Sequence, residues 1–288
     1  MWNVERLAEN PIIHAGLDPS IGTNINGPSL IRTPDWLPKP FGRYYLYFAD
    51  HGGQYIRLAF ADDLRGPWAI YRPGTLRLDQ TSGHGHVASP DVHVDEAARQ
   101  IVMYFHTPVP GAQRTFRAAS ADGLHFVAET ADLGPSYFRV FRHEDAFYAL
   151  AMAGRPSGGI LLRSSDGRTP FEPGPRFLPR QRHVAVQKLG DRLRIVFSRG
   201  EDCPEHLLVT DMDLSGPWHS WQPEEPRSLL LPETQYEGGR LPLEASRFGP
   251  AHGPVRQLRD PALFEEDGRT YLVYACAGES GLALACVR

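Results

Sequence analysis

Three ionisable side chains of this chain lie in short segments that precede apolar, strand-like stretches. Asp91 lies in the segment SPDV, Asp260 in RDPA, and His183 in RHVA. A carboxylate can accept or donate a proton, and an imidazole does so near neutral pH. These three side chains are therefore candidates for acid–base catalysis.

A second set of residues could complete such a site. Glu237, in a Tyr-Glu-Gly segment of a long irregular stretch, is a fourth catalytic candidate, because a carboxyl group beside an apolar wall can stay protonated. The amide, aromatic and basic side chains near the same kind of segment could bind a polar substrate. The predicted binding residues are Asn24, Asn26, His86, Tyr137, Arg139, Arg182 and Arg259.

Each catalytic candidate also has a structural interpretation. Asp91 could cap a turn, and Asp260 could form an ion pair with the neighbouring Arg259, which would keep its carboxylate charged. Glu237 could be one of several solvated loop charges, and His183 a buried, hydrogen-bonded histidine. The acid and the base cannot be told apart from sequence, with Glu237 favoured slightly over His183 as the acid.

The positioning of these residues follows from a fivefold repeat. Aromatic or aliphatic segments typical of strands occur at 44–48, 101–106, 147–152, 193–198 and 270–275. Each follows a turn and a shorter strand, and these shorter strands begin at 27–29, 89–91, 134–136, 182–183 and 259–261. Several units close on GPW or DG turns. A strand–turn–strand unit repeated five times predicts an all-β fold, a five-bladed β-propeller, with the candidate residues lining its central funnel.

We expect a single domain that spans residues 1–288, because no linker interrupts the repeat. The last unit ends with the strand-like segment 282–287, so a segment near the N-terminus should supply its fourth strand. The longest irregular stretch, 223–258, separates the fourth and fifth units, and loops of this length are usually functional.

The charge composition argues against nucleic acid and anionic membranes as partners. Lys and Arg number 30 and Asp and Glu 34, which gives a net charge of −4 and no basic field for nucleic acid or an anionic membrane. No apolar run is long enough to cross a bilayer, and the first residues do not resemble a signal peptide. Three cysteines without a CxxC pair favour a reducing, cytoplasmic location. The sequence leaves the oligomeric state open.

Cofactor motifs are absent. No GxGxxG, GxxxxGK[ST], HExxH or GxSxG segment occurs. We therefore predict that no cofactor is required and no metal-ligand set is assigned, although a single metal ion on the propeller axis is compatible with the sequence.

The SPDV and RDPALFEEDGRTYLVY segments, together with Tyr-Glu-Gly at 236–238, resemble those of the five-bladed propeller glycoside hydrolases. Families 43 and 117 are the most similar and family 32 is more distant. Family 43 enzymes invert, with an Asp base on the first blade, an Asp that tunes its pKa and a Glu acid. This sequence departs from them in the segment Asn24-Ile25-Asn26-Gly27-Pro28-Ser29, where an Asp-Pro pair is expected, and family 117 suggests a histidine acid instead.

Two functions follow from this resemblance. The first is a glycoside hydrolase, inverting, that acts on a small oligosaccharide or glycoside in the funnel. The alternative is a non-catalytic propeller that binds carbohydrate or a protein and has lost the first-blade carboxylate. The carboxylates at Asp91, Glu237 and Asp260 favour the enzyme, and Gly27 favours the binder.

Overall fold

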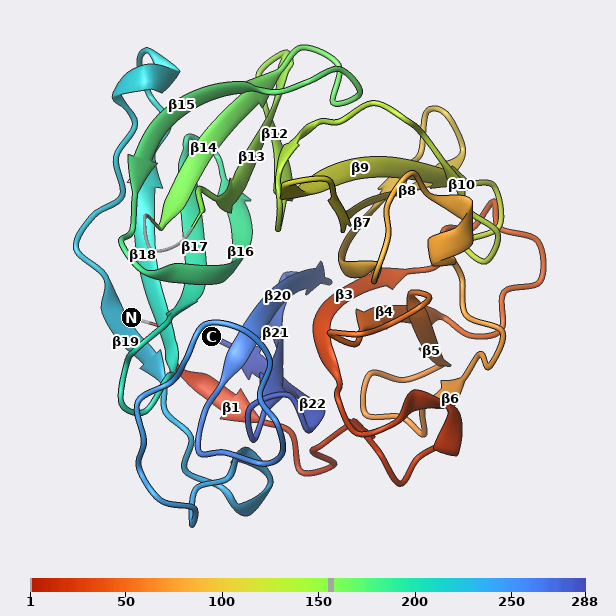
Figure 1. The fold of residues 1–288 in the computed structure, drawn as a ribbon, viewed down its shortest axis with the longest axis vertical. Coiled ribbons are helices and arrows are strands. Elements are labelled where there is room, and N and C mark those ends of the chain that lie inside the picture. Colours follow the sequence, from red (N-terminus) through yellow and green to blue (C-terminus); the bar gives the residue numbers. More distant parts are fainter. Residues whose placement is uncertain (1, 155–157) are drawn as a thin grey trace.

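The computed structural model describes residues 2–154 and 158–288, which form five antiparallel sheets around a central axis (Figure 1). Blade I holds β3 (Asn26–Arg32), β4 (Tyr44–Ala49), β5 (Arg57–Ala61) and β6 (Ala69–Ile70). Blade II holds β7 (Ala88–Asp95), β8 (Gln100–Val109), β9 (Ala112–Ser120), β10 (Val127–Ala128) and β11 (Gly134–Pro135). The predicted five-bladed propeller is confirmed.

The remaining three blades follow the same order from the axis outward. Blade III holds β12 (Arg139–His143), β13 (Ala146–Met152), β14 (Gly159–Ser164) and β15 (Glu172–Phe177). Blade IV holds β16 (Gln181–Leu189), β17 (Arg192–Arg199), β18 (Leu207–Asp213) and β19 (Arg227–Leu230). Blade V holds β20 (Arg259–Glu266), β21 (Arg269–Cys276), β22 (Gly281–Val287), β1 (Val4–Arg6) and β2 (Ile13–His14).

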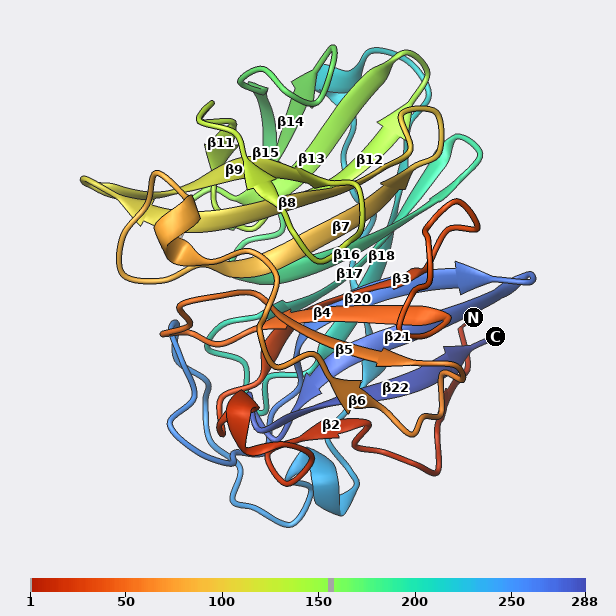
Figure 2. The same cartoon turned by 90° about the vertical axis from the view of Figure 1, so that its right-hand side faces the viewer.

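The N-terminal segment closes the ring, as the sequence predicts. Val4 pairs with Val287 and Arg6 with Ala285, so β1 is the fourth strand of blade V. Backbone hydrogen bonds join Asn3 and Arg288, and both termini lie together on one face of the molecule (Figure 2). The innermost strands begin on the opposite face, which we call the mouth.

The core consists of five apolar clusters, one at each seam between neighbouring blades. The seam between blades IV and V, for example, packs Val196 and Val209 against Leu272 and Tyr274, all at most 1% exposed. A single four-stranded blade leaves both faces uncovered, so burial of these side chains requires both neighbours. Within residues 2–154 and 158–288, helix is limited to four 3-10 turns: η1 (Pro19–Ile21), η2 (Leu78–Gln80), η3 (Trp218–Ser220) and η4 (Gln235–Glu237). No helix among the described residues could span a membrane.

A backbone irregularity marks the start of the innermost strands. The register shifts at Asn26/Ser29, Ala88/Asp91 and Arg259/Ala262, and within each shift a residue of positive φ precedes a proline. These residues are Gly27 (φ 56°), Ser89 (φ 49°) and Asp260 (φ 48°). A bulge of this kind bends a strand and redirects a side chain. The recurring Pro segments in the sequence are therefore the bulges at the mouth of the funnel.

Candidate active site

Two histidine–carboxylate pairs lie at the mouth. His183, at the start of β16, contacts a carboxylate oxygen of Asp260 through Nδ1, and both side chains are almost wholly buried. His51, in the turn after β4, places Nδ1 2.8 Å from Oε2 of Glu279, which lies between β21 and β22. Each carboxylate can orient its imidazole and fix its tautomer.

Both histidines line one small cavity of about 10 Å³, together with Tyr137, Met152, Arg182, Phe248 and Gly249. A space of this size holds about one water molecule. His51 also lines a larger pocket of about 770 Å³ between the first residues of blade I and residues 250–254, so the two spaces adjoin. The pocket is the expected place for a ligand, with the water-sized cavity at its inner end.

The two pairs differ in their electrostatics. Burial and the nearby Arg182 and Arg139 cations lower the pKa of His183 well below its ordinary value, so the ring is neutral at physiological pH. Burial alone would raise the pKa of Glu279, but the hydrogen bond and charge of His51, with the charge of Arg259, lower it to about 2. The neutral His183 can accept a proton, and Glu279 is a charged hydrogen-bond partner of His51.

Amide side chains complete the second pair. Asn24 donates to Oε2 of Glu279 at 2.7 Å and accepts the backbone N–H of His51 at 2.9 Å. Asn26 donates to Oδ1 of Asn24 at 2.8 Å. Asn24 lines the larger pocket, as expected of a binding residue, whereas Asn26 is buried behind it.

A row of aromatic rings extends from His183 across the axis. Tyr137 lies with its ring centre 4.3 Å from that of His183 and 4.3 Å from that of His106, and His86 follows at 5.7 Å from His106. Burial, followed by the charge of neighbouring His and Arg side chains, lowers the pKa of His106 well below its usual range. The Nδ1 atom of His106 is buried without a hydrogen-bond partner among the described residues, so this ring has a polar atom available for a ligand or a water.

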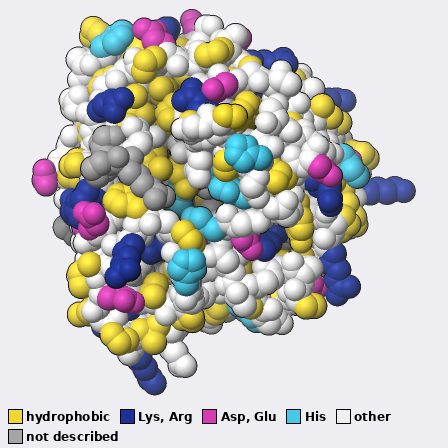
Figure 3. Space-filling view, in the orientation of Figure 1, with side chains coloured by type: hydrophobic (Ala, Val, Ile, Leu, Met, Phe, Trp, Pro, Cys, Tyr) yellow, Lys and Arg dark blue, Asp and Glu magenta, His cyan; other side chains and the backbone are white. Residues whose placement is uncertain are grey.

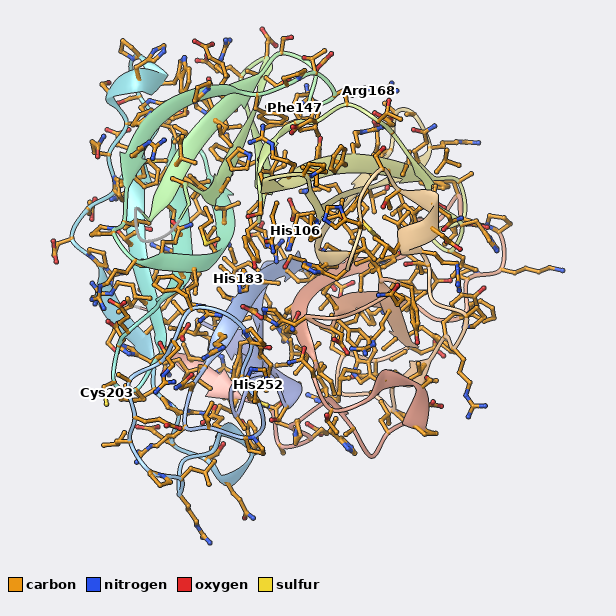
Figure 4. The ribbon with its side chains drawn as sticks, in the orientation of Figure 1. His106, Phe147, Arg168, His183, Cys203 and His252 are labelled. Atoms are coloured by element: carbon orange, nitrogen blue, oxygen red, sulfur yellow. The ribbon has the colours of Figure 1, made fainter. Side chains whose placement is uncertain are left out.

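Two of the predicted binding residues, Arg182 and Arg259, donate hydrogen bonds to backbone and side-chain groups around the site. Arg182 donates to the carbonyl oxygens of Arg247 (2.6 Å) and Gly249 (3.0 Å), and Arg259 donates to Glu279 (2.9 Å) and to the Gly249 carbonyl (3.2 Å). Residues 247–249 belong to the long loop, which therefore does reach the mouth, as expected. In Figure 4, His252 of this loop lies apart from His106 and His183, which are near the axis.

Arg139 has a structural role that its sequence does not reveal. It donates to the carbonyl oxygens of Pro28, Pro90 and Phe138 and so ties blades I, II and III together at the axis. Because these bonds occupy both terminal nitrogens in a buried position, the prediction that Arg139 binds substrate is not supported.

The structure places Glu237 away from the funnel, which corrects its assignment as the acid. Its carboxylate accepts bonds from Arg6 (2.8 Å), Tyr274 (2.8 Å) and the backbone N–H groups of Glu233 and Thr234. Burial alone would raise the pKa of Glu237, but these donors lower it. A carboxylate held charged by four donors does not release a proton to a leaving group, and Glu237 instead anchors β1.

Asp91 is also displaced from its predicted position. Its Oδ2 accepts the backbone N–H of Val140 at 2.7 Å and lies 2.9 Å from Nε2 of His93, at the seam between blades II and III. Asp91 lines neither the small cavity nor the pocket at the mouth. Asp91 does lie at a strand opener, as predicted, and within a bulge. The bulge turns the side chain of its positive-φ residue toward the axis, and that residue is Asp260 in blade V but Ser89 in blade II.

The first-blade position of the family 43 base is occupied by Gly27. Its backbone N–H donates to Oδ2 of Asp260 at 3.3 Å, and an added Cβ would lie 3.1 Å from the Cα of Ser89. With φ at 56°, this position favours glycine. Ser89 and Asp260 have a similar φ at the equivalent positions, so the close approach of Ser89 is the main obstacle to a side chain at this position.

The sequence repeat does not identify His51 and Glu279 as site residues. Neither lies at a strand opener: each occupies a turn between the second and third strands of its blade, so the fivefold pattern gave no signal for them. Histidine side chains do gather around the central hollow in the space-filling view (Figure 3). Among the described residues, no group of three or more His, Cys, Asp or Glu side chains is placed to hold a metal ion.

Comparison with known proteins fits this architecture. An uncharacterized protein of Acanthamoeba polyphaga mimivirus is 38% identical to the chain in an alignment that covers 90% of the chain and 82% of the viral protein. The chain belongs to the family of this viral protein. No protein-family model matches the chain.

Solved structures show the fold shared with glycoside hydrolases. A glycosyl hydrolase from Bacteroides ovatus has a TM-score of 0.71 at 11% identity, with 99% of this chain and 93% of that chain covered. A thermostable family-43 glycoside hydrolase has a TM-score of 0.63 at 14% identity, covering 92% and 89%. An exo-1,5-α-L-arabinanase from a bovine ruminal metagenomic library has a TM-score of 0.58 at 13% identity, covering 92% of each chain. The chain thus shares the five-bladed propeller fold of these glycoside hydrolases.

Proposed function

We propose that this protein is a glycosidase that cleaves a small glycoside at the mouth of the propeller, with inversion, and that two histidines transfer the protons. The observation that carries the proposal is the pair of histidine–carboxylate contacts, His183–Asp260 and His51–Glu279, on one water-sized cavity. The propeller fold shared with glycoside hydrolases supports the choice of substrate class.

His183 acts as the base. When Nδ1 of His183 donates its proton in a hydrogen bond to Asp260, the ring is neutral and Nε2 is unprotonated. Nε2 can then take a proton from a water in the small cavity. That water attacks the anomeric carbon of a sugar bound in the larger pocket. A single displacement of this kind inverts the anomeric configuration, as in enzymes whose carboxylate activates water.

His51 acts as the acid. It borders both spaces, so it can reach the oxygen of the leaving group in the larger pocket, and Glu279 stabilises its protonated form. Proton donation to the departing oxygen completes the cleavage, and the water proton taken up by His183 returns to solvent afterwards.

The substrate is expected to be uncharged. The cations at the mouth each face a carboxylate: Arg259 faces Glu205, His51 faces Glu279, and Arg57 lies 2.8 Å from Asp50. No excess of positive charge is left to favour an acidic sugar.

The test is turnover of a panel of 4-nitrophenyl furanosides and pyranosides, with the product anomer identified by NMR. We expect the variant His183→Gln to lose about 10²–10⁴ in kcat on the best substrate. His125→Gln is a matched control, because His125 lies 2.7 Å from Asp122 in a similar pair but is exposed. Retained configuration in the product, or full activity of His183→Gln, would refute the mechanism.

A second function, sugar binding without cleavage, is favoured by Gly27 and by the charge state of the carboxylates. The carboxyl groups of Glu279, Asp91 and Glu237 all have a lowered pKa, so none of them is a ready proton donor. Calorimetric binding of a sugar from the same panel, with no product after long incubation, would select this function over the glycosidase.

A further inference from the structure

A second pocket lies at the seam between blades II and III, on the face that carries the termini. Its volume is about 490 Å³, and its lining includes the ends of β7 and β12 and the beginnings of β8 and β13. Apolar side chains form one wall, and charged groups lie across from it. The wall residues that matter here are Val102, Val140 and Phe147.

A hydrogen bond between neighbouring blades sets β7 beside β12, and each strand contributes one basic side chain to this pocket. The backbone N–H of Val140 in β12 donates to Asp91 in β7 at 2.7 Å, and both strands run from the mouth toward the opposite face. His93 lies two residues beyond Asp91, and Arg142 two residues beyond Val140. Both side chains line the pocket.

His93 is prepared to carry a positive charge. Its Nε2 lies 2.9 Å from Oδ2 of Asp91, while Nδ1 makes no hydrogen bond with any described residue, and the side chain is 40% exposed. Burial alone would lower the pKa of His93, but the charge and hydrogen bond of Asp91 raise it. The ring can therefore present an N–H group to a ligand.

Arg142 has no carboxylate partner among the described residues. Its guanidinium lies 4.9 Å from the ring centre of Phe147, and the residue is exposed. Arg168 also lines the pocket and lies near Phe147 in Figure 4, but it shares Glu129 with Arg117. Arg142 is thus the guanidinium that remains available.

The acidic groups around the pocket are engaged elsewhere. Asp166 accepts the backbone N–H groups of Arg168 and Thr169, Asp95 accepts that of Ala98, and Glu96 accepts the indole N–H of Trp36. The donors of His93 and Arg142 are therefore the groups left to meet a ligand beside the apolar wall.

We propose that this pocket binds a small amphipathic monocarboxylate, with its carboxylate between His93 and Arg142 and its apolar body on Val102, Val140 and Phe147. Charge-assisted hydrogen bonds to the carboxylate supply specificity, and burial of the apolar body supplies most of the affinity. The site is separate from the mouth and does not depend on the proposed glycosidase activity.

Benzoate is the probe, and benzamide is its uncharged counterpart. An NMR titration of the full chain follows the imidazole signals of His93 as either compound is added. We expect benzoate to shift these signals and to bind about tenfold or more tightly than benzamide, because a charged acceptor is worth more to both donors. Asp91→Asn should weaken benzoate binding by favouring the neutral form of His93.

Arg142→Gln is expected to weaken benzoate binding about tenfold, and Arg168→Gln, the matched control on the same rim, less than twofold. Arg142 is exposed, so its replacement should not disturb folding. Equal affinity for benzoate and benzamide, no shift of His93, or an equal effect of the two arginine variants would each overturn the proposal.

Discussion

The Nδ1 atom of His51 lies 2.8 Å from Oε2 of Glu279, a carboxylate whose side chain is completely removed from solvent. The same carboxylate accepts a bond from Arg259 through its other oxygen, at 2.9 Å. The hydrogen bonds from His51 and Arg259 keep the pKa of this buried carboxyl low, so Glu279 stays charged beside His51. The relationship underlies the first prediction.

Replacement of His51 should separate substrates by their leaving groups. We expect His51→Gln to lose about 10²–10⁴ in kcat on alkyl glycosides, whose departure needs a proton, and far less on 2,4-dinitrophenyl glycosides. Steady-state kinetics on one substrate of each kind measures the difference. Equal losses on both would show that His51 binds or folds rather than donating a proton.

The pH profile should report His183 on its acid side. Its pKa lies well below the ordinary 6.5, so the base stays unprotonated, and kcat/KM should not fall until the pH is well under 6.5. Below that lowered pKa, protonation removes the base and activity is lost. An acid limb with a midpoint near or above 6.5 in kcat/KM would contradict this role.

Arg259 should control the seating of the loop at the mouth, because one of its nitrogens donates both to Glu279 and to the Gly249 carbonyl. In Arg259→Lys, trypsin should cut after the exposed Arg247 several times faster than in the parent protein. Cleavage after Arg240, which is also exposed but outside these contacts, is the internal control. Parallel acceleration at both sites would indicate general unfolding instead.

Glu237→Gln should destabilise the fold without a specific loss of catalysis. Removal of one partner of a buried ion pair costs about 3–5 kcal/mol, and Arg6 remains 21% exposed, so we expect the lower part of that range. The lowered pKa of Glu237 adds stability above its unfolded-state pKa, about 4.3, and this contribution is lost as the pH falls through the folded-state value.

Urea unfolding of Glu237→Gln and the parent protein at pH 7 and at pH 3 measures both effects. The two proteins should differ at pH 7, and the difference should be smaller at pH 3. If kcat of folded Glu237→Gln fell by more than tenfold with unchanged stability, the structural assignment of this residue would be wrong.

Gly27→Asp should fail to create a family 43 base. Asp260 holds a similar φ at the equivalent position of blade V, so the cost should come chiefly from the new Cβ, which would press on Ser89. We expect lower stability and no gain in kcat, measured by thermal unfolding and by turnover of the best aryl glycoside. Gly268→Asp, which has a similar φ of 71° but open space around it, separates the steric effect from the conformational one.

The five-bladed architecture was predictable because the sequence repeats one strand–turn–strand unit five times. The five aromatic segments of the sequence fall within β4, β8, β13, β17 and β21, and the pairing of β1 with β22 follows from the missing strand of the last unit. A period of this kind depends only on local alternation and turns, which a single sequence contains.

The site was predictable only in part. His183, Asp260 and Tyr137 occupy openers and do meet at the axis, whereas the partner of His51 comes from the other end of the chain. Asp91 and Asp260 occupy similar sequence contexts, yet the bulge sends the side chain of one to a seam and that of the other to the mouth. Such a difference of one position within a bulge is invisible without coordinates.

The junction that closes the ring has a mechanical consequence. Because Val4 pairs with Val287 and Arg6 with Ala285, tension applied between the two ends of the chain would pull on the same end of the β1–β22 ladder. Hydrogen bonds loaded in this way yield one after another, as in a zipper, rather than together as in shear. The ring should therefore open under low force at blade V, where the ion pair of Glu5 with Arg288 breaks before the bond of Arg6 to Glu237.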